Sequence, residues 1–257
     1  MSELMVLIRK DLLELWRSKK ILILTFVFLF VAVASPIFAK LTPMLLKSIP
    51  ITPGLSINLP DPTYMDAVDQ FIKNVSQIAI LVLVFVVSGA VVDEKTRKNL
   101  EILLTKPVSR AKFIISKFVS YLAAISGAFV VSSAIFYYYT VTTFNTFSLS
   151  NFSLMAANTL IYVLMISAIT ILASTITKNS VSAAGLGFLS YILFGSIFGF
   201  IEQIAKYSPN YIFGNYKNLL TNGWNSNFTA PTILIVIVIV ISVLSAVALF
   251  QKQEIER

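Results

Sequence analysis

Apolar residues dominate the chain in six long runs, and shorter segments between them hold most of the polar residues. Each run has at most one charged side chain and is long enough, at 1.5 Å per helical residue, to cross a hydrocarbon core of about 30 Å. The pattern therefore predicts an all-α membrane protein, a single transmembrane domain over residues 1–257 with six transmembrane helices. The predicted spans are residues 21–39, 74–92, 113–139, 154–177, 181–201 and 231–250.

The first 20 residues read as a short amphipathic helix, because apolar and charged side chains separate onto two arcs of a helical wheel. Its basic end suits a helix lying in the membrane interface. The following run is too long, and too far from residue 1, for a cleaved signal peptide. The apolar arc holds Leu4, Ile8, Leu12 and Leu15, the charged arc holds Glu3, Arg9, Lys10, Glu14 and Arg17, and Asp11, Val6 and Leu13 break the pattern.

Two segments are predicted to be loops on one side of the membrane. Residues 40–73 contain five of the nine prolines, which argues against a long helix, and residues 202–228 contain Tyr207-Ser208-Pro209. Thr63 and Asp66 have the spacing of a helix-capping pair. Asp61, Asp66 and Asp69 are then either a solvated helix start or a vestibule that attracts cations. We take as a possible external gate Asp61, Asp66, Asp69, Tyr207 and Pro209.

The basic residues predict the orientation. Fifteen of the 20 Lys and Arg fall in residues 1–20, residues 93–117, Lys178 and the tail, against five on the opposite side. Cytoplasmic loops carry this excess, so both termini and the loop 93–112 are expected in the cytoplasm of a multi-pass plasma-membrane protein, with a prokaryotic membrane as the best fit. The net charge of +8 thus reports topology and does not predict binding to nucleic acid.

Several kinds of chemistry are excluded by missing residues. The chain has no Cys and no His, so a metal site would need carboxylates alone, and none is expected. The spans lack the mid-membrane carboxylates typical of ion-coupled carriers. No GxxxxGK[ST] phosphate-binding loop is present. We therefore predict that the chain is not an enzyme by itself and that another subunit supplies energy.

Small residues are frequent in the fourth and fifth predicted spans, and Gly195–Gly199 forms a GxxxG pattern. We favour tight packing within one bundle over contact with a second copy, although the pattern fits both.

The loop 93–112 is the most highly charged interval between two spans. Residues 94–105 read as a short helix with apolar and basic sides, Pro107 ends it, and Ser109 is a possible N-cap of the next span. A short helix joined rigidly to two spans can transmit a push from a soluble partner. The alternative is a basic loop that lies on lipid headgroups.

The order of these features resembles the ABC-2 type permease family, the membrane subunits of a class of ATP-binding-cassette (ABC) exporters. The resemblance is carried by RKDLLELWRSKK before the first span, by DEKTRKNLEILLTKPVSRAKFIISKF after the second, and by Tyr207-Ser208-Pro209. Glu94, Leu103, Leu104, Pro107, Ser109, Arg110 and Lys117 match the loop pattern of the family, whereas Asn99-Leu100 replaces its usual Gly-Thr.

The resemblance implies an interfacial elbow helix over 1–20 and a coupling helix that docks into a separate ABC ATPase, present in two copies beside a second permease chain. ATP and Mg²⁺ would bind to the ATPase, with no cofactor on this chain. The implied ATPase contacts are Glu94, Lys95, Arg97, Leu100, Leu103, Leu104, Pro107, Ser109 and Arg110, and the implied elbow contacts are Arg9, Lys10, Trp16 and Arg17. Two alternatives remain: a related permease that serves maturation of an extracytoplasmic metalloenzyme, and a non-transporting scaffold that recruits a soluble protein.

Overall fold

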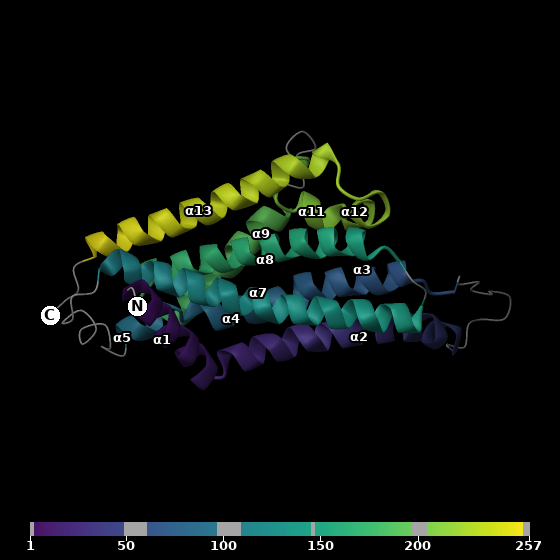
Figure 1. The fold of residues 1–257 in the computed structure, drawn as a ribbon, viewed down its shortest axis with the longest axis horizontal. Helices are drawn as coiled ribbons and strands as arrows, with labels where there is room; N and C mark the ends of the chain where they lie inside the picture. Colours follow the sequence, from purple (N-terminus) through teal and green to yellow (C-terminus); the bar gives the residue numbers. More distant parts are fainter. Residues whose placement is uncertain (1–2, 49–60, 97–108, 145–146, 197–204, 254–257) are drawn as a thin grey trace.

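The structure is a computed structural model, which describes residues 3–48, 61–96, 109–144, 147–196 and 205–253. Every regular element in these ranges is a helix, as the apolar runs predict. The long helices lie beside one another along the long axis of the molecule, and α13 crosses the others obliquely (Figure 1). The long elements are α2 (Lys20–Ser48), α7 (Arg110–Thr143), α8 (Leu149–Ile176), α9 (Ser180–Ser196) and α13 (Thr229–Lys252).

Five stretches are long and apolar enough to cross a membrane: Lys20–Leu45, Tyr64–Thr96, Arg110–Thr143, Leu149–Ile176 and Ser226–Lys252. The described part of the fifth predicted span, α9, is shorter, and residues 197–204 lie outside the described ranges. A membrane protein with five candidate spans is therefore confirmed, and the full count of six remains a prediction.

The first span differs from its prediction at its far end. We expected it to stop at residue 39 because Pro43 and further prolines follow, yet α2 includes both Pro36 and Pro43 and runs to Ser48. A hydroxyl precedes each proline and adds a hydrogen bond in the same turn: Ser35 donates to the carbonyl of Val31 (2.6 Å) and Thr42 to that of Phe38 (2.7 Å). The carbonyls that lose an amide donor to the prolines are those of Ala32 and Ala39. Membrane helices tolerate proline when such local donors and neighbouring helices stabilise the turn.

The second span is interrupted twice. It consists of α3 (Tyr64–Asn74), a π-helical turn η1 (Val75–Ala79), α4 (Ile80–Ser88) and α5 (Val92–Thr96). The predicted loop 40–73 is therefore helical at both ends. Between α4 and α5 the amides of Val91 and Val92 donate to the hydroxyl of Ser174 in α8 (3.0 and 3.1 Å). This bond replaces the helical hydrogen bonds lost at the break and fixes α5 against α8.

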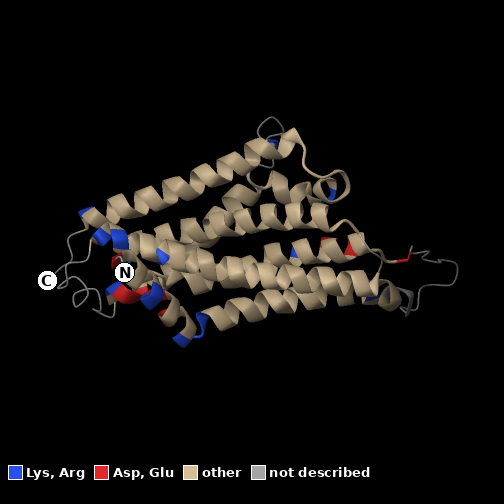
Figure 2. Ribbon diagram, in the orientation of Figure 1, with Lys and Arg blue, Asp and Glu red and all other residues tan. Residues whose placement is uncertain are grey.

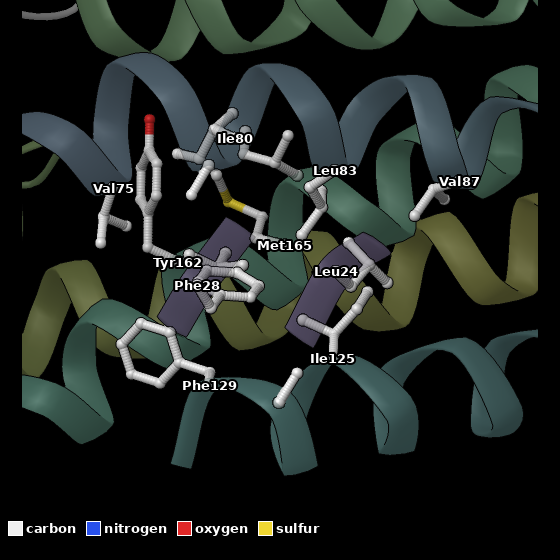
Figure 3. Packing of buried hydrophobic residues seen from close by; sticks show 14 of the residues in the cluster. Leu24, Phe28, Val75, Ile80, Leu83, Val87, Ile125, Phe129, Tyr162 and Met165 are labelled. Carbon is white, nitrogen blue, oxygen red and sulfur yellow. The ribbon is translucent and has the colours of Figure 1, made fainter. Parts of the chain in front are cut away.

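The core lies between α2, the second span, α7 and α8, where aromatic and branched side chains interdigitate (Figure 3). Phe28 packs edge-on against Phe129 with ring centroids 5.6 Å apart, and Phe71 stacks on Phe136 at 4.3 Å. In contrast, only 22% of the most apolar stretch of α13 is buried. Most of α13 is therefore available to lipid or to another membrane helix.

Short helices cover the end of the bundle opposite the termini, within the predicted loop 202–228. They are α11 (Tyr211–Gly214), α12 (Tyr216–Asn222) and the 3₁₀ turn η3 (Ser226–Phe228). The side chain of Asn151 donates to the carbonyl of Leu220 (3.0 Å), which ties this cover to α8.

Candidate functional site

Charged side chains gather at the end of the bundle that holds both termini (Figure 2). The helix α1 (Glu3–Arg17) lies there across the bases of α5 and α7 and meets α2 at a sharp bend (Figure 1). The bend falls at Lys19, whose φ of 61° is in the left-handed region that costs a residue other than glycine about 1 kcal/mol. The two helices that flank residues 97–108 have their nearer ends here: α5 ends at Thr96 and α7 begins at Arg110.

A buried lysine joins three of these helices. The ammonium group of Lys117, in α7, lies 2.9 Å from Asp11 Oδ1 and 3.3 Å from Glu14 Oε2 in α1, and it contacts Glu94 Oε1 in α5. Lys10 adds a second cation, 2.7 Å from the same Glu94 oxygen. We call these five residues the Lys117 cluster. The side chains of Asp11, Glu94 and Lys117 are at most 4% exposed, so the pairs among these three are shielded from water, whereas Lys10 and Glu14 are partly exposed.

The position of Asp11 follows from the face that α1 presents to the bundle. Leu7, Asp11 and Leu15 are the buried residues of α1, and their spacing of four places them on one side of the helix. The hydroxyl of Ser116 donates to Asp11 Oδ2 (2.6 Å), and Lys117 pairs with the other oxygen. Asp11 interrupts the amphipathic pattern because its partners are in α7. A charged residue on the apolar arc of the helical wheel was thus the sequence signal for a buried ion pair at Asp11.

The three carboxylates of the cluster lie close enough together to hold a metal ion. Lys117 already supplies a positive charge within 3.3 Å of each of Asp11 and Glu14 and in contact with Glu94. The arrangement is therefore a network of ion pairs that holds helices together.

A second group of polar contacts lies on the other side of α5. Lys95 donates to the side-chain oxygen of Gln253 (2.8 Å) and to the carbonyl of Thr175, and Gln253 Nε2 donates to that same carbonyl (3.0 Å). Arg110, at the start of α7, donates to the carbonyls of Gln251 (3.1 Å) and Gln253 (2.9 Å). We call Lys95, Arg110, Thr175 and Gln253 the Gln253 cluster.

Asp93 connects α5 to two further elements. It pairs with Lys20 (3.3 Å) at the start of α2 and accepts a hydrogen bond from Ser180 (2.8 Å) at the start of α9. Its carboxylate lies over Gly89, where an added Cβ would come within 2.1 Å of Asp93 Oδ2. Glycine at this position gives the carboxylate the space to reach both partners.

The predicted ATPase contacts fall into two groups. Glu94, Lys95, Ser109 and Arg110 are described and lie together at this end of the bundle. Ser109 is the N-cap of α7, as predicted, and its hydroxyl accepts from the amide of Lys112. The remaining predicted contacts lie outside the described residues: Arg97, Leu100, Leu103, Leu104 and Pro107. The contribution of Asp11, Asp93 and Gln253 was not predicted.

Among the predicted elbow residues, Lys10 alone belongs to the Lys117 cluster. Arg9, Trp16 and Arg17 are exposed, and Trp16 is 57% accessible beside other apolar side chains of α1. Together with Met5, Ile8, Leu12 and Leu13 the Trp16 ring forms an open apolar groove. This surface is what a helix lying in the membrane interface would present to lipid.

The residues proposed as an external gate differ in their contacts and exposure. Asp66 caps α3 by accepting from the amide of Thr63 (2.7 Å), and Asp69 pairs with Lys217 of α12 (2.9 Å). Asp61 and Tyr207 are exposed, whereas Pro209 is buried. The structure thus gives Asp66 and Asp69 structural roles at the end of the bundle opposite the Lys117 cluster.

A bundle of long apolar helices, with its charged groups paired at one end, defines an all-helical membrane protein. A family model described as ABC-2 family transporter protein matches residues 5–255. The chain belongs to this family, whose members are membrane subunits of ABC transporters. YxlG, an uncharacterized transmembrane protein of Bacillus subtilis (strain 168), is 23% identical over 232 residues, which cover 89% of each chain.

Proposed function

We propose that this chain is the permease subunit of an ABC exporter in a plasma membrane, with both termini in the cytoplasm. Two permease chains would form the translocation path, and two copies of a separate ATPase would bind ATP and Mg²⁺ and drive it. The observation that carries the proposal is the Lys117 cluster. The pairs of Asp11 and Glu94 with Lys117 fasten α1, α5 and α7 to one another at the end of the bundle where Thr96 and Ser109 flank residues 97–108.

A rigid base is what mechanical coupling requires. A force applied to residues 97–108 reaches α5 and α7 directly, and through Glu94 and Lys117 it reaches α1 as well. Because the ion pairs are buried, water competes with them little, and separating one partner from the others is costly. The three helices therefore respond to a push as one body.

The test is purification of the tagged chain from its native membranes in mild detergent, followed by identification of bound ATPase and measurement of ATP hydrolysis. The wild-type chain should retain an ABC ATPase, and Leu103→Asp should lose it, because the predicted apolar contact becomes charged. Leu244→Ala, at a 63% exposed position of α13, is the control and should retain the ATPase.

The outcomes separate the competing functions. A chain that purifies without an ATPase contradicts the proposal. Retention of full binding and full ATP-dependent activity by variants at Glu94, Leu103 and Arg110 would remove the coupling assignment. A scaffold would bind its partner, but the rate of ATP hydrolysis by that partner would not depend on these residues.

A further inference from the structure

Lys95 and Arg110 stand at the two ends of the segment 97–108, and both reach the C-terminal end of α13. Lys95 donates to the side chain of Gln253 (2.8 Å), and Arg110 donates to its backbone carbonyl (2.9 Å). Gln253 thus contacts both of the helices that flank the segment, α5 through Lys95 and α7 through Arg110. Stacking of Phe250 on Phe113, with ring centroids 5.4 Å apart, holds α13 against the start of α7 just above these bonds.

Part of this arrangement is ordinary helix capping. The last carbonyls of α8 and α13 have no partner within their own helices, and cations are favoured at helix C-termini. Lys95 supplies such a cation to Thr175 of α8, and Arg110 supplies one to Gln251 of α13. Capping alone would be satisfied by any basic side chain within reach.

The side chain of Gln253 goes beyond capping, because both ends of its amide group are used. The oxygen accepts from Lys95 of α5, while the nitrogen donates to the Thr175 carbonyl of α8 (3.0 Å). A carboxylate could not donate to that carbonyl, and a lysine could not accept from Lys95. The position therefore uses a property specific to an amide, and its effect is to bridge three helices.

We propose that Gln253 is a positioning residue through which α5 and the start of α7, which flank the predicted coupling segment, move α13. The inference rests on the proposed function and adds a second route of transmission, beside that through α1. Displacement of α5 and α7 by an ATPase would pull the end of α13 through Gln253. α13 packs on α7 and α8 through one face, which includes Ile235, Ala246 and Phe250, while the rest of its apolar stretch is not buried by the chain, so a shift of α13 is opposed by that one face alone.

The absence of cysteine allows a direct test. Spin labels at Lys178→Cys and Ala248→Cys, both exposed positions, report the distance between the turn after α8 and the end of α13. In purified protein without nucleotide, we expect one narrow distance distribution for the parent chain and a broad one for Gln253→Ala. In complex with the ATPase and trapped nucleotide, the parent distance should shift.

Gln253→Ala should lose that shift, since loss of a hydrogen bond to a charged group changes an equilibrium by about tenfold. Lys252→Gln, which removes a neighbouring exposed charge, is the matched control and should shift like the parent. Gln253→Glu keeps the acceptor for Lys95 and loses the donor for Thr175, so it should give an intermediate shift. That partial rescue would not follow from a general loss of folding.

Two results overturn the inference and are distinguishable. If the parent chain binds the ATPase and shifts, and Gln253→Ala has the same narrow distribution and the same shift, Gln253 does not position α13, and the proposed function stands. If the parent chain binds no ATPase, both proposals fail.

Discussion

At the scale of single residues, a lysine with a side chain only 3% exposed can keep its charge only if close partners replace the lost water. Lys117 has three such partners, and Lys10 offsets part of their negative charge at Glu94. The buried members depend most on one another, because removal of Lys117 leaves two buried carboxylates with only the partly exposed Lys10 beside them. Exposed pairs such as Lys112 with Glu3 (2.5 Å) have no comparable dependence, because water can replace either partner.

Lys117→Met should destabilise the protein by about 3–5 kcal/mol, because it leaves the buried carboxylates of Asp11 and Glu94 with only the partly exposed Lys10 as a cation. Thermal unfolding in detergent, followed by circular dichroism, measures the effect. Lys112→Met is the control on the same helix, and its cost should be below about 1 kcal/mol since both partners are exposed. Equal losses in the two variants would show that the Lys117 cluster does not hold the helices together.

At the scale of helices, hydrophobic patterning predicted which segments are apolar enough to span, but not where each helix ends. α2 continues through Pro43 although the proline density of the segment argued against it, and the break before α5 depends on Ser174 of another helix. Partners distant in sequence cannot be read from the pattern of one segment. The same limit applies to the site: the basic loop was visible in the sequence, whereas the burial of Asp11 and the role of Gln253 required the packing of α7 and α13.

The tight packing expected for the fourth and fifth predicted spans is found at Gly187. A Cβ there would lie 2.6 Å from the hydroxyl oxygen of Thr170 in α8 and 3.1 Å from Val84 in α4. Close approach of this kind is how membrane helices gain van der Waals contact. At Gly185, two residues earlier in α9, an added Cβ meets nothing within 4 Å. The Gly195–Gly199 pair remains a prediction, because Gly199 lies outside the described residues.

We therefore expect Gly187→Ala to destabilise the protein by about 1–3 kcal/mol, through overpacking against α4 and α8. Gly185→Ala should be neutral or stabilising by up to about 1 kcal/mol, because alanine favours the helix and has free space. The free energies of unfolding of the two variants, measured in the same detergent, test this difference. If Gly187→Ala is as stable as Gly185→Ala, α9 is not packed as closely as described.

At the scale of the whole molecule, the charged residues of the described ranges lie mostly toward the two ends of the bundle (Figure 2). One end has the Lys117 and Gln253 clusters and both termini. The other has the caps of α3 and the ion pair of Asp69 with Lys217. The surplus of basic residues at the first end is the property that orients membrane proteins, so it also predicts which end faces the cytoplasm.

Single cysteines in this cysteine-free chain would test that orientation. Lys178→Cys lies in the turn after α8 and Thr221→Cys in α12, both at exposed positions. In intact cells a membrane-impermeant maleimide should label Thr221→Cys and not Lys178→Cys, and both should react after the membrane is permeabilised. Labelling of Lys178→Cys in intact cells would reverse the predicted topology.

The adjacency of Glu94 and Lys95 limits how α5 can move. Neighbouring residues of a helix point about 100° apart, and here one is bound to α1 and α7 while the next is bound to α8 and α13. Rotation of α5 about its own axis would break one set of bonds or the other. Translation along or across the bundle, with the bound ends of the neighbouring helices, preserves both. The contacts of these two residues therefore resist rotation of α5 about its axis and allow it to translate together with its neighbours.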